Sequence, residues 1–153
     1  MKNYLLIAMF TAVVFLGSAQ TASACSCVRP LPGVSLKTQV TTSKKEATVI
    51  FAGKVLSIRY SAEKMNGTPL KAYAKIAVER SWKGPLNELI EVETENICCI
   101  CGYTFEIGKT YIIYSYSPNP GTINVSSCSR TAQITDTSPD EKYLGKVRKP
   151  KKS

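Results

Sequence analysis

The sequence contains no histidine among its 153 residues. Histidine is the side chain whose unperturbed pKa lies nearest neutrality, and its imidazole is the most frequent general base and metal ligand in proteins. Its absence argues against most hydrolase mechanisms and against an imidazole-ligated metal site. We therefore predict that the protein is not an enzyme and has no cofactor of its own.

Long apolar runs are also scarce. One extends from Tyr4 to Leu16, and it is shorter than the ~20 residues that a helix needs to cross a bilayer core. Lys2 precedes this run and Ala22-Ser23-Ala24 follows it, which is the charged, apolar and small-residue order of a signal peptide. The sequence therefore predicts a signal peptide over residues 1–24 and a mature chain that begins at Cys25 without stable membrane insertion. The expected location is secreted or extracellular, or periplasmic in a Gram-negative bacterium.

Acidic residues are few, since 11 Asp and Glu stand against 20 Lys and Arg, giving a formal net charge of +9. Such an excess is typical of proteins that bind nucleic acid, heparin-like polyanions or a membrane surface. Several of the lysines, however, lie between Lys146 and Lys152, and chain ends are commonly frayed and solvated. We therefore interpret residues 146–153 as a basic tail and expect no nucleic-acid partner.

Cysteine is missing between Val28 and Ile97, and all six cysteines follow the predicted cleavage site: Cys25, Cys27, Cys98, Cys99, Cys101 and Cys128. An even number in a small exported chain is typical of a disulfide framework. Six cysteines allow fifteen pairings, and the count does not choose among them. Cys98 and Cys101 also have the Cys-x-x-Cys spacing of redox and metal sites, so a small oxidoreductase remains an alternative.

Segments rich in β-branched and apolar residues recur along the chain and predict five strands. They cover residues 47–60, 70–82, 88–95, 111–116 and 122–127. Within the first of them, Gly53 indicates a bulge or bend. Asn66-Gly67, between the first two strands, is typical of a tight hairpin. Five strands in one small domain favour a barrel or a sandwich.

Two helices are considered. Ser138-Pro139-Asp140-Glu141 combines a capping serine with a proline at the first helical position and a glutamate three residues after the cap, so a short helix should begin there and end near Gly145. Residues 35–45 place Leu36 and Val40 on one side of a helix but contain many threonines. Because threonine has a low helix propensity, the sequence leaves open whether this segment forms a helix.

Cys25 would carry the amino group of the mature chain. If Cys25 and Cys27 are both bridged to distant strands, the terminus is clamped, and the α-amine and carbonyl of Cys25 are held at the spacing of a five-membered chelate ring. An α-amine has a pKa of roughly 7.7 to 8.0, so a metal ion displaces its proton at modest cost. The sequence therefore suggests Cys25 as a metal ligand through main-chain atoms.

Four short motifs support a more specific interpretation. They are Cys25-Ser26-Cys27 at the mature start, the VIFAGKV segment at 49–55, Cys101-Gly102-Tyr103 and Ser127-Cys128-Ser129. Together they resemble the amino-terminal, netrin-like inhibitory domain of the tissue inhibitors of metalloproteinases. The resemblance covers most of residues 25–130, and the Cys-x-Cys terminus directly after a signal peptide is its most specific part.

The resemblance implies a mainly β, five-stranded OB-fold barrel over residues 25–145, with one or two short helices and a disulfide-stapled amino terminus. It implies bridges from Cys25 to Cys101 and from Cys27 to Cys128, and leaves Cys98 and Cys99 unassigned. The implied function is that of a secreted metalloendopeptidase inhibitor. In the family, the amine and carbonyl of the first cysteine bind the catalytic zinc of the partner protease and displace its activated water, at the position that a catalytic zinc keeps open.

The resemblance also assigns the protease-binding residues around Cys25. Ser26 would point into the specificity pocket beside the zinc, and Cys27, Val28 and Pro30 would continue along the substrate groove. The segment 98–101, tied to Cys25 through Cys101, would form the adjoining edge.

The chain departs from the family in ways that keep alternatives open. The vertebrate members carry a third bridge in this domain and a second disulfide-rich domain. Here no cysteine lies between Val28 and Ile97, and Cys98 and Cys99 are additional. An intermolecular bridge, a rearranged pairing or reduced thiols all fit these two. A secreted, disulfide-stapled OB-fold binding module without inhibitory activity is the alternative function. Lipidation of Cys25 is a further one, and it would acylate the amine that zinc chelation needs.

Overall fold

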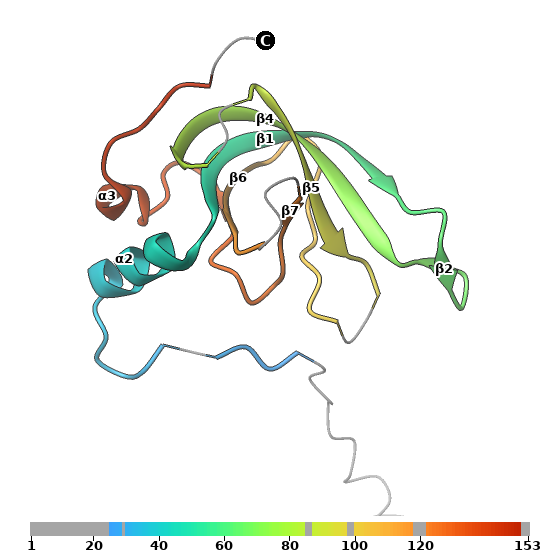
Figure 1. The fold of residues 1–153 in the computed structure, drawn as a ribbon, viewed down its shortest axis with the longest axis horizontal. Coiled ribbons are helices and arrows are strands. Elements are labelled where there is room, and N and C mark those ends of the chain that lie inside the picture. The colour runs from blue at the N-terminus through green and yellow to red at the C-terminus, as the bar shows by residue number, and fades with distance from the viewer. Residues whose placement is uncertain (1–24, 29, 85–86, 98–99, 118–121, 151–153) are drawn as a thin grey trace, which may run out of the picture.

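The computed structural model describes residues 25–28, 30–84, 87–97, 100–117 and 122–150. The predicted signal peptide over residues 1–24 and the unassigned Cys98 and Cys99 lie outside the described residues. The described chain is mainly β (Figure 1).

A six-stranded sheet with the order β7-β5-β4-β1-β6-β8 forms the body of the protein. Its strands are β1 (Val49–Tyr60), β4 (Lys71–Lys83), β5 (Leu89–Glu95), β6 (Thr110–Ser115), β7 (Ile123–Asn124) and β8 (Ala132–Ile134). The pairs are antiparallel except for β5 and β7, which are parallel. The sheet curls strongly, so that it forms a half-barrel (Figure 1).

The five predicted strands correspond to β1, β4, β5, β6 and β7, although β7 is shorter than the predicted segment 122–127. The predicted count is nevertheless wrong for the sheet, which has six strands because Ala132–Ile134 adds β8 along the edge of β6. Three residues carry too little alternation to be recognised as a strand, and here the exposed edge of β6 supplies their hydrogen-bonding partner.

The hairpin at Asn66-Gly67 is confirmed. It joins β2 (Lys64–Met65) to β3 (Thr68–Pro69). Asn66 has a φ of 51° and Gly67 a φ of 81°, which is the pair of positive values that a two-residue type I′ turn requires. The irregularity expected at Gly53 is also present as a shift in the β1–β4 register between Ala52 and Gly53. A side chain at Gly53 would overlap the backbone carbonyl of Ala77, which explains the glycine.

The open question about residues 35–45 is answered by α2 (Leu36–Glu46). Ser35 caps it by accepting a hydrogen bond from the Thr38 amide at 3.2 Å, and Val40 packs against the sheet with none of its surface exposed. Tertiary burial thus outweighs the low propensity of the threonines. None of the helices in the described part of the chain is long and apolar enough to cross a membrane.

The second predicted helix is the single turn α3 (Glu141–Leu144), and its start is two residues later than a cap at Ser138 implies. Asp140 occupies the N-cap position, but its carboxylate makes no capping bond because it is engaged elsewhere in the fold. Gly145, with a φ of 77°, ends the helix as predicted.

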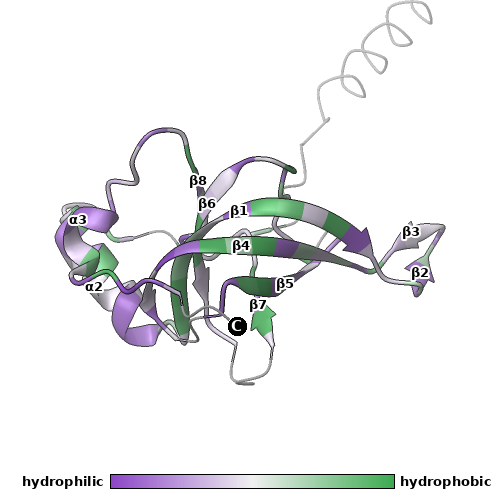
Figure 2. Ribbon diagram, turned by 90° about the horizontal axis from the view of Figure 1, so that it is seen from above, coloured by the Kyte–Doolittle hydropathy of each residue, from purple (hydrophilic) through white to green (hydrophobic). Residues whose placement is uncertain are grey.

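The two faces of the sheet bury separate hydrophobic cores. Inside the curl, Phe51, Ile76 and Ile113 belong to the first core. On the other face, Ile50 and Ile112 pack with residues of α2 and α3. The hydrophobic colour in Figure 2 follows β1, β4, β5 and β7, which line the first core. Adjacent residues of β1 therefore point into different cores, as the two-residue period of a strand demands.

A polar cluster stabilises the second core. The Tyr114 hydroxyl donates to the Asp140 carboxylate at 2.8 Å, and the Arg130 guanidinium contacts both carboxylate oxygens at 2.9 and 2.7 Å. Tyr114 is completely buried and Asp140 is only 4% exposed. Burial, reinforced by the neighbouring carboxylate, raises the pKa of Tyr114 well above its ordinary value near 10.

This raised pKa predicts alkaline destabilisation. The folded state favours neutral Tyr114, so its contribution is complete below about pH 10 and is lost as the pH rises above the pKa of the unfolded chain. The free energy of unfolding, measured with urea between pH 8 and pH 11, should fall as the pH rises. In Tyr114→Phe this fall should be shallower by up to about 1.4 kcal/mol per pH unit. Equal pH slopes for the two proteins would contradict this assignment.

Candidate functional site

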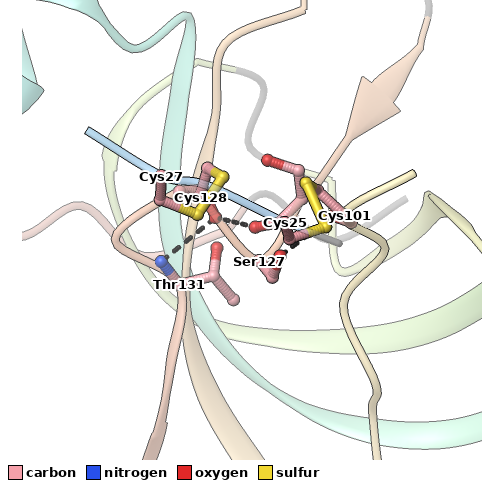
Figure 3. The surroundings of a disulfide bond; sticks show 8 residues. Cys25, Cys27, Cys101, Ser127, Cys128 and Thr131 are labelled. Carbon is pink, nitrogen blue, oxygen red and sulfur yellow. Dashed lines mark hydrogen bonds between the residues drawn. A yellow bond between two sulfur atoms is a disulfide. The ribbon is translucent and has the colours of Figure 1, made fainter. Parts of the chain in front are cut away.

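Two disulfide bonds hold the amino-terminal segment against the body of the protein. Cys25 is bonded to Cys101 and Cys27 to Cys128, with Cα–Cα distances of 5.4 and 5.1 Å. These are the two pairs that the family resemblance implies. Figure 3 shows them side by side, with Ser127 next to the pair that Cys101 forms.

The two segments that receive these bonds are also joined to each other. The amide of Ser127 donates to the Cys101 carbonyl at 2.8 Å, and its hydroxyl donates to the same oxygen at 3.2 Å. Gly102 and Ser126 form an antiparallel bridge beside them. Cys101 and Cys128 therefore belong to one unit, residues 101–103 and 125–128, which we call the platform. Cys25 and Cys27 are both anchored to this platform rather than to two independent loops.

Hydrogen bonds from β5 attach this platform to the sheet. The amide of Tyr103 donates to the Thr94 hydroxyl at 2.7 Å, and the amide of Val125 donates to the Glu93 carbonyl at 2.9 Å. Gly102 passes so close to β5 that a Cβ at this position would overlap the backbone carbonyl of Glu95. The end of β5 therefore fixes the position of the platform relative to the sheet.

Gly102→Ala should weaken the platform. Because the carbonyl of Glu95 is backbone and cannot rotate away, the methyl group must displace the chain, and we expect a loss of about 1–3 kcal/mol in the free energy of unfolding. Urea unfolding with the disulfides intact measures it. Thr104→Ala, an exposed neighbour, is the control and should change stability by less than about 0.5 kcal/mol. Equal stability of Gly102→Ala and the control would be inconsistent with the close approach.

The amino-terminal segment presents apolar side chains to solvent. Ser26 and Pro30 are exposed, Val28 is 99% exposed and Leu31 is 77% exposed. Ile100, next to Cys101, is 50% exposed. Large apolar groups that gather on one surface are typical of a protein-contact site. An open groove lies beside this segment, lined by Val28, Leu31 and Val34, by polar residues of α2 and by the loop 126–131.

The far end of the same segment has its own anchor. The Gln39 side-chain amide donates to the Val34 carbonyl at 2.9 Å, and its oxygen accepts from Arg130 at 3.2 Å. Arg130 is in turn paired with buried Asp140. The segment 25–34 is thus held at both ends. Disulfides hold it at Cys25 and Cys27, and the side chains of Gln39, Arg130 and Asp140 hold it at Val34.

Sequence reasoning did not find Gln39, Arg130 or Asp140 as parts of the site. The sequence marks Asp140 only as a helix-start residue, and no local pattern links positions 39, 130 and 140. Cys101 is bonded to Cys25, while the Cys98 of the proposed redox pair lies outside the described residues. Among the residues that the structure describes, no three His, Cys, Asp or Glu side chains form a group that could hold a metal ion.

The predicted ligand and contact residues are therefore brought together in one region: Cys25, Ser26, Cys27, Val28 and Cys101. Searches of the sequence against protein-family models and against curated proteins found no match.

Proposed function

We propose that this protein, after removal of residues 1–24, inhibits a zinc metalloendopeptidase by placing the α-amine and carbonyl of Cys25 on the catalytic zinc. The observation that carries the proposal is the double disulfide clamp, which attaches Cys25 and Cys27 to one platform that is itself bonded to the sheet. A terminus held in this way has a fixed direction, as metal coordination through main-chain atoms requires.

The chemistry of the mature terminus suits this role. An amine nitrogen and the carbonyl oxygen of the same residue close a five-membered ring around a metal ion, and the modest pKa of an α-amine allows zinc to replace its proton. A catalytic zinc has three protein ligands and one position for water. Occupation of that position by Cys25 removes the water that attacks the peptide bond.

The neighbouring residues supply the rest of the contact. Exposed Ser26 would enter the specificity pocket beside the zinc, and Cys27 and Val28 would continue along the substrate groove, with Cys101 beside them. The full exposure of Val28 supports this arrangement, since an apolar side chain placed in solvent gains most when a partner covers it.

Rigidity of the clamp favours tight binding. The bonds join residues separated by 76 and 101 positions in the sequence, and closing loops of this size stabilises a fold by about 4–5 kcal/mol each in the chain-entropy account. A segment that is already ordered also loses less conformational entropy when it docks. Inhibition by a wedge of this kind therefore needs no refolding of the inhibitor.

The same resemblance leads us to interpret the curled sheet as a disulfide-stapled variant of the OB-fold barrel. The support is that β1 pairs with both β4 and β6, and that the remaining strands extend this unit on either side as the sheet curls.

The proposal is tested with the exported chain, whose first residue is established by amino-terminal sequencing and intact mass. We expect it to inhibit at least one member of a panel of zinc metalloendopeptidases that cleave a fluorogenic peptide. Inhibition should be competitive with a hydroxamate that binds the catalytic zinc, since both would occupy the same coordination position. An inhibitor that binds together with the hydroxamate would contradict chelation, and a chain that inhibits no member of the panel would favour the binding module without inhibitory activity.

A further inference from the structure

A pocket of about 220 Å³ opens at the edge of the first core. The end of β1, the start of β4 and the end of β5 line it, together with residues 102–105. It therefore lies toward the end of the sheet that carries the β2–β3 hairpin (Figure 1). Because four separate segments of the chain enclose this pocket, no local motif in the sequence indicates it.

Strand pairing explains why space remains here. Ile58 of β1 lies opposite Ala74 of β4. Two residues away, Ala72 lies between Tyr60 of β1 and Thr94 of β5. Alternate residues of a strand point to the same face of a sheet, and both alanines belong to the buried face of β4. Their methyl groups leave a trough between larger neighbours, where longer side chains would fill the core.

Aromatic side chains form a second wall of the pocket. Tyr103 and Phe105 both line it, and the centroids of their rings are 4.8 Å apart. Tyr111 packs edge-on against the two rings, at centroid distances of 5.9 and 5.1 Å, and this contact fixes them from the side of the core. Aromatic rings prefer edge-to-face and offset contacts with one another. The wall therefore suits a further aromatic ring.

Polar side chains of the loop after β5 limit the chemistry of a ligand. The side-chain nitrogen of Asn96 donates to the Pro69 carbonyl at 3.1 Å, and its side-chain oxygen is an acceptor for an N–H or O–H group. The neighbouring Glu95 also lines the pocket. Its carboxylate disfavours an anionic ligand by charge repulsion.

We propose that this pocket binds a small neutral aromatic molecule with an N–H or O–H donor, of the size of an indole or a phenol. A cavity of about 150 Å³ accepts benzene, so the pocket of about 220 Å³ admits one substituted ring or two fused rings. Its combination of apolar walls with a few polar groups is typical of sites for small organic ligands, in which the polar groups fix the orientation.

Other ligands fit this pocket less well. A fatty acid needs more volume, and Glu95 repels its carboxylate. A metal ion needs a group of ligating side chains, and the described residues contain no cluster of three His, Cys, Asp or Glu that could supply them. These comparisons favour a compact, uncharged ring.

The pocket shares Gly102 and Tyr103 with the platform, but its described lining contains none of the residues proposed to contact a protease. The proposal is therefore independent of protease inhibition. The Tyr103 amide donates to the Thr94 hydroxyl at 2.7 Å, and both residues line the pocket. A ligand that contacts both should stabilise this hydrogen bond and slow hydrogen exchange at the Tyr103 amide.

The test is an NMR titration of the ¹⁵N-labelled exported chain with indole as the probe. We expect saturable binding with a dissociation constant on the order of 1 mM, since a ligand of so few atoms has little surface to bury. The largest amide shifts should occur at Ala72, Ala74 and Tyr103, and exchange at the Tyr103 amide should slow. Shifts that do not saturate, or that centre on the groove beside residues 25–34, would overturn the proposal.

A filled pocket provides the matched variant. Ala72→Leu should weaken indole binding at least about tenfold without lowering the urea midpoint, because the added carbons occupy space that is already present. Ala77→Leu adds the same group on the opposite face of β4, outside the pocket, and should bind indole within about twofold of the unmodified protein. The shift map of the unmodified protein still tests the site if Ala72→Leu does not fold.

Three results would count against this assignment. Equal weakening in Ala72→Leu and Ala77→Leu would mean that indole binds elsewhere. Tighter binding of benzoate than of indole would contradict the preference for a neutral ring. Tighter binding of N-acetyltryptophanamide than of indole would show that the pocket receives a tryptophan side chain of a protein rather than a free small molecule.

Discussion

Addition of one alanine in front of Cys25 should strongly weaken protease inhibition without altering the fold. The extra residue converts the Cys25 amine into a peptide nitrogen, which cannot donate a lone pair to zinc, and it places a chain in the space reserved for the metal. Loss of a buried central contact costs about 2–4 kcal/mol in typical interfaces. We therefore expect the inhibition constant to rise by about 30- to 1000-fold.

The control for this variant is the same alanine added after Ser153. It has the same mass and composition, so any difference between the two proteins comes from the position of the residue. Both should show the Cys25–Cys101 and Cys27–Cys128 bonds on mapping by mass spectrometry, and both should have the same near-ultraviolet circular dichroism. Undiminished inhibition by the amino-terminal extension, with both bonds formed, would contradict chelation by Cys25.

Asp140→Ala should strongly destabilise the fold. It leaves the Arg130 guanidinium without its bidentate partner and the Tyr114 hydroxyl without an acceptor, at a place where Tyr114 is completely buried. Removal of one partner from a buried ion pair typically costs 3–5 kcal/mol. Urea unfolding with the disulfides intact should show a decrease of about this size.

Asp136→Ala is the matched control, because Asp136 is an exposed carboxylate in the loop that precedes α3. It should change the free energy of unfolding by less than about 0.5 kcal/mol. Since Arg130 also contacts Gln39, which binds the Val34 carbonyl, Asp140→Ala should additionally increase amide hydrogen exchange at Leu31, Gly33 and Val34. A loss of less than about 1 kcal/mol would contradict the role given to this cluster.

Local sequence was sufficient where the determinant of a structure lies within a few residues. In β4, the small and branched residues Ala72, Ala74, Ile76 and Val78 alternate with polar ones, and that alternation survives in the structure as a buried face. Asn66-Gly67 specifies its turn because both residues tolerate positive φ. Gly145 likewise marks the end of α3.

Elements whose stability depends on a distant partner were predicted less well. β8 exists because β6 offers it an edge, and α2 is held by the burial of Val40. The start of α3 moved from the Ser138 cap to Asp140, and the carboxylate of Asp140 binds residues from β6 and from the loop after Cys128. In each case the deciding contact joins residues far apart in the chain.

The sequence by itself determined a mainly β chain without histidine, strongly basic and rich in cysteine, with a Cys-x-Cys motif directly after a predicted signal peptide. The tertiary structure decided which of the described cysteines pair. The number of cysteines could not choose among fifteen pairings. In the structure, the hydrogen bond from the Ser127 amide to the Cys101 carbonyl holds Cys101 and Cys128 beside each other, where they bond to Cys25 and Cys27. The physical reason is the same for the disulfide clamp and for the Asp140 cluster: composition and periodicity report short-range preferences, but a site arises where the curled sheet brings distant segments into contact.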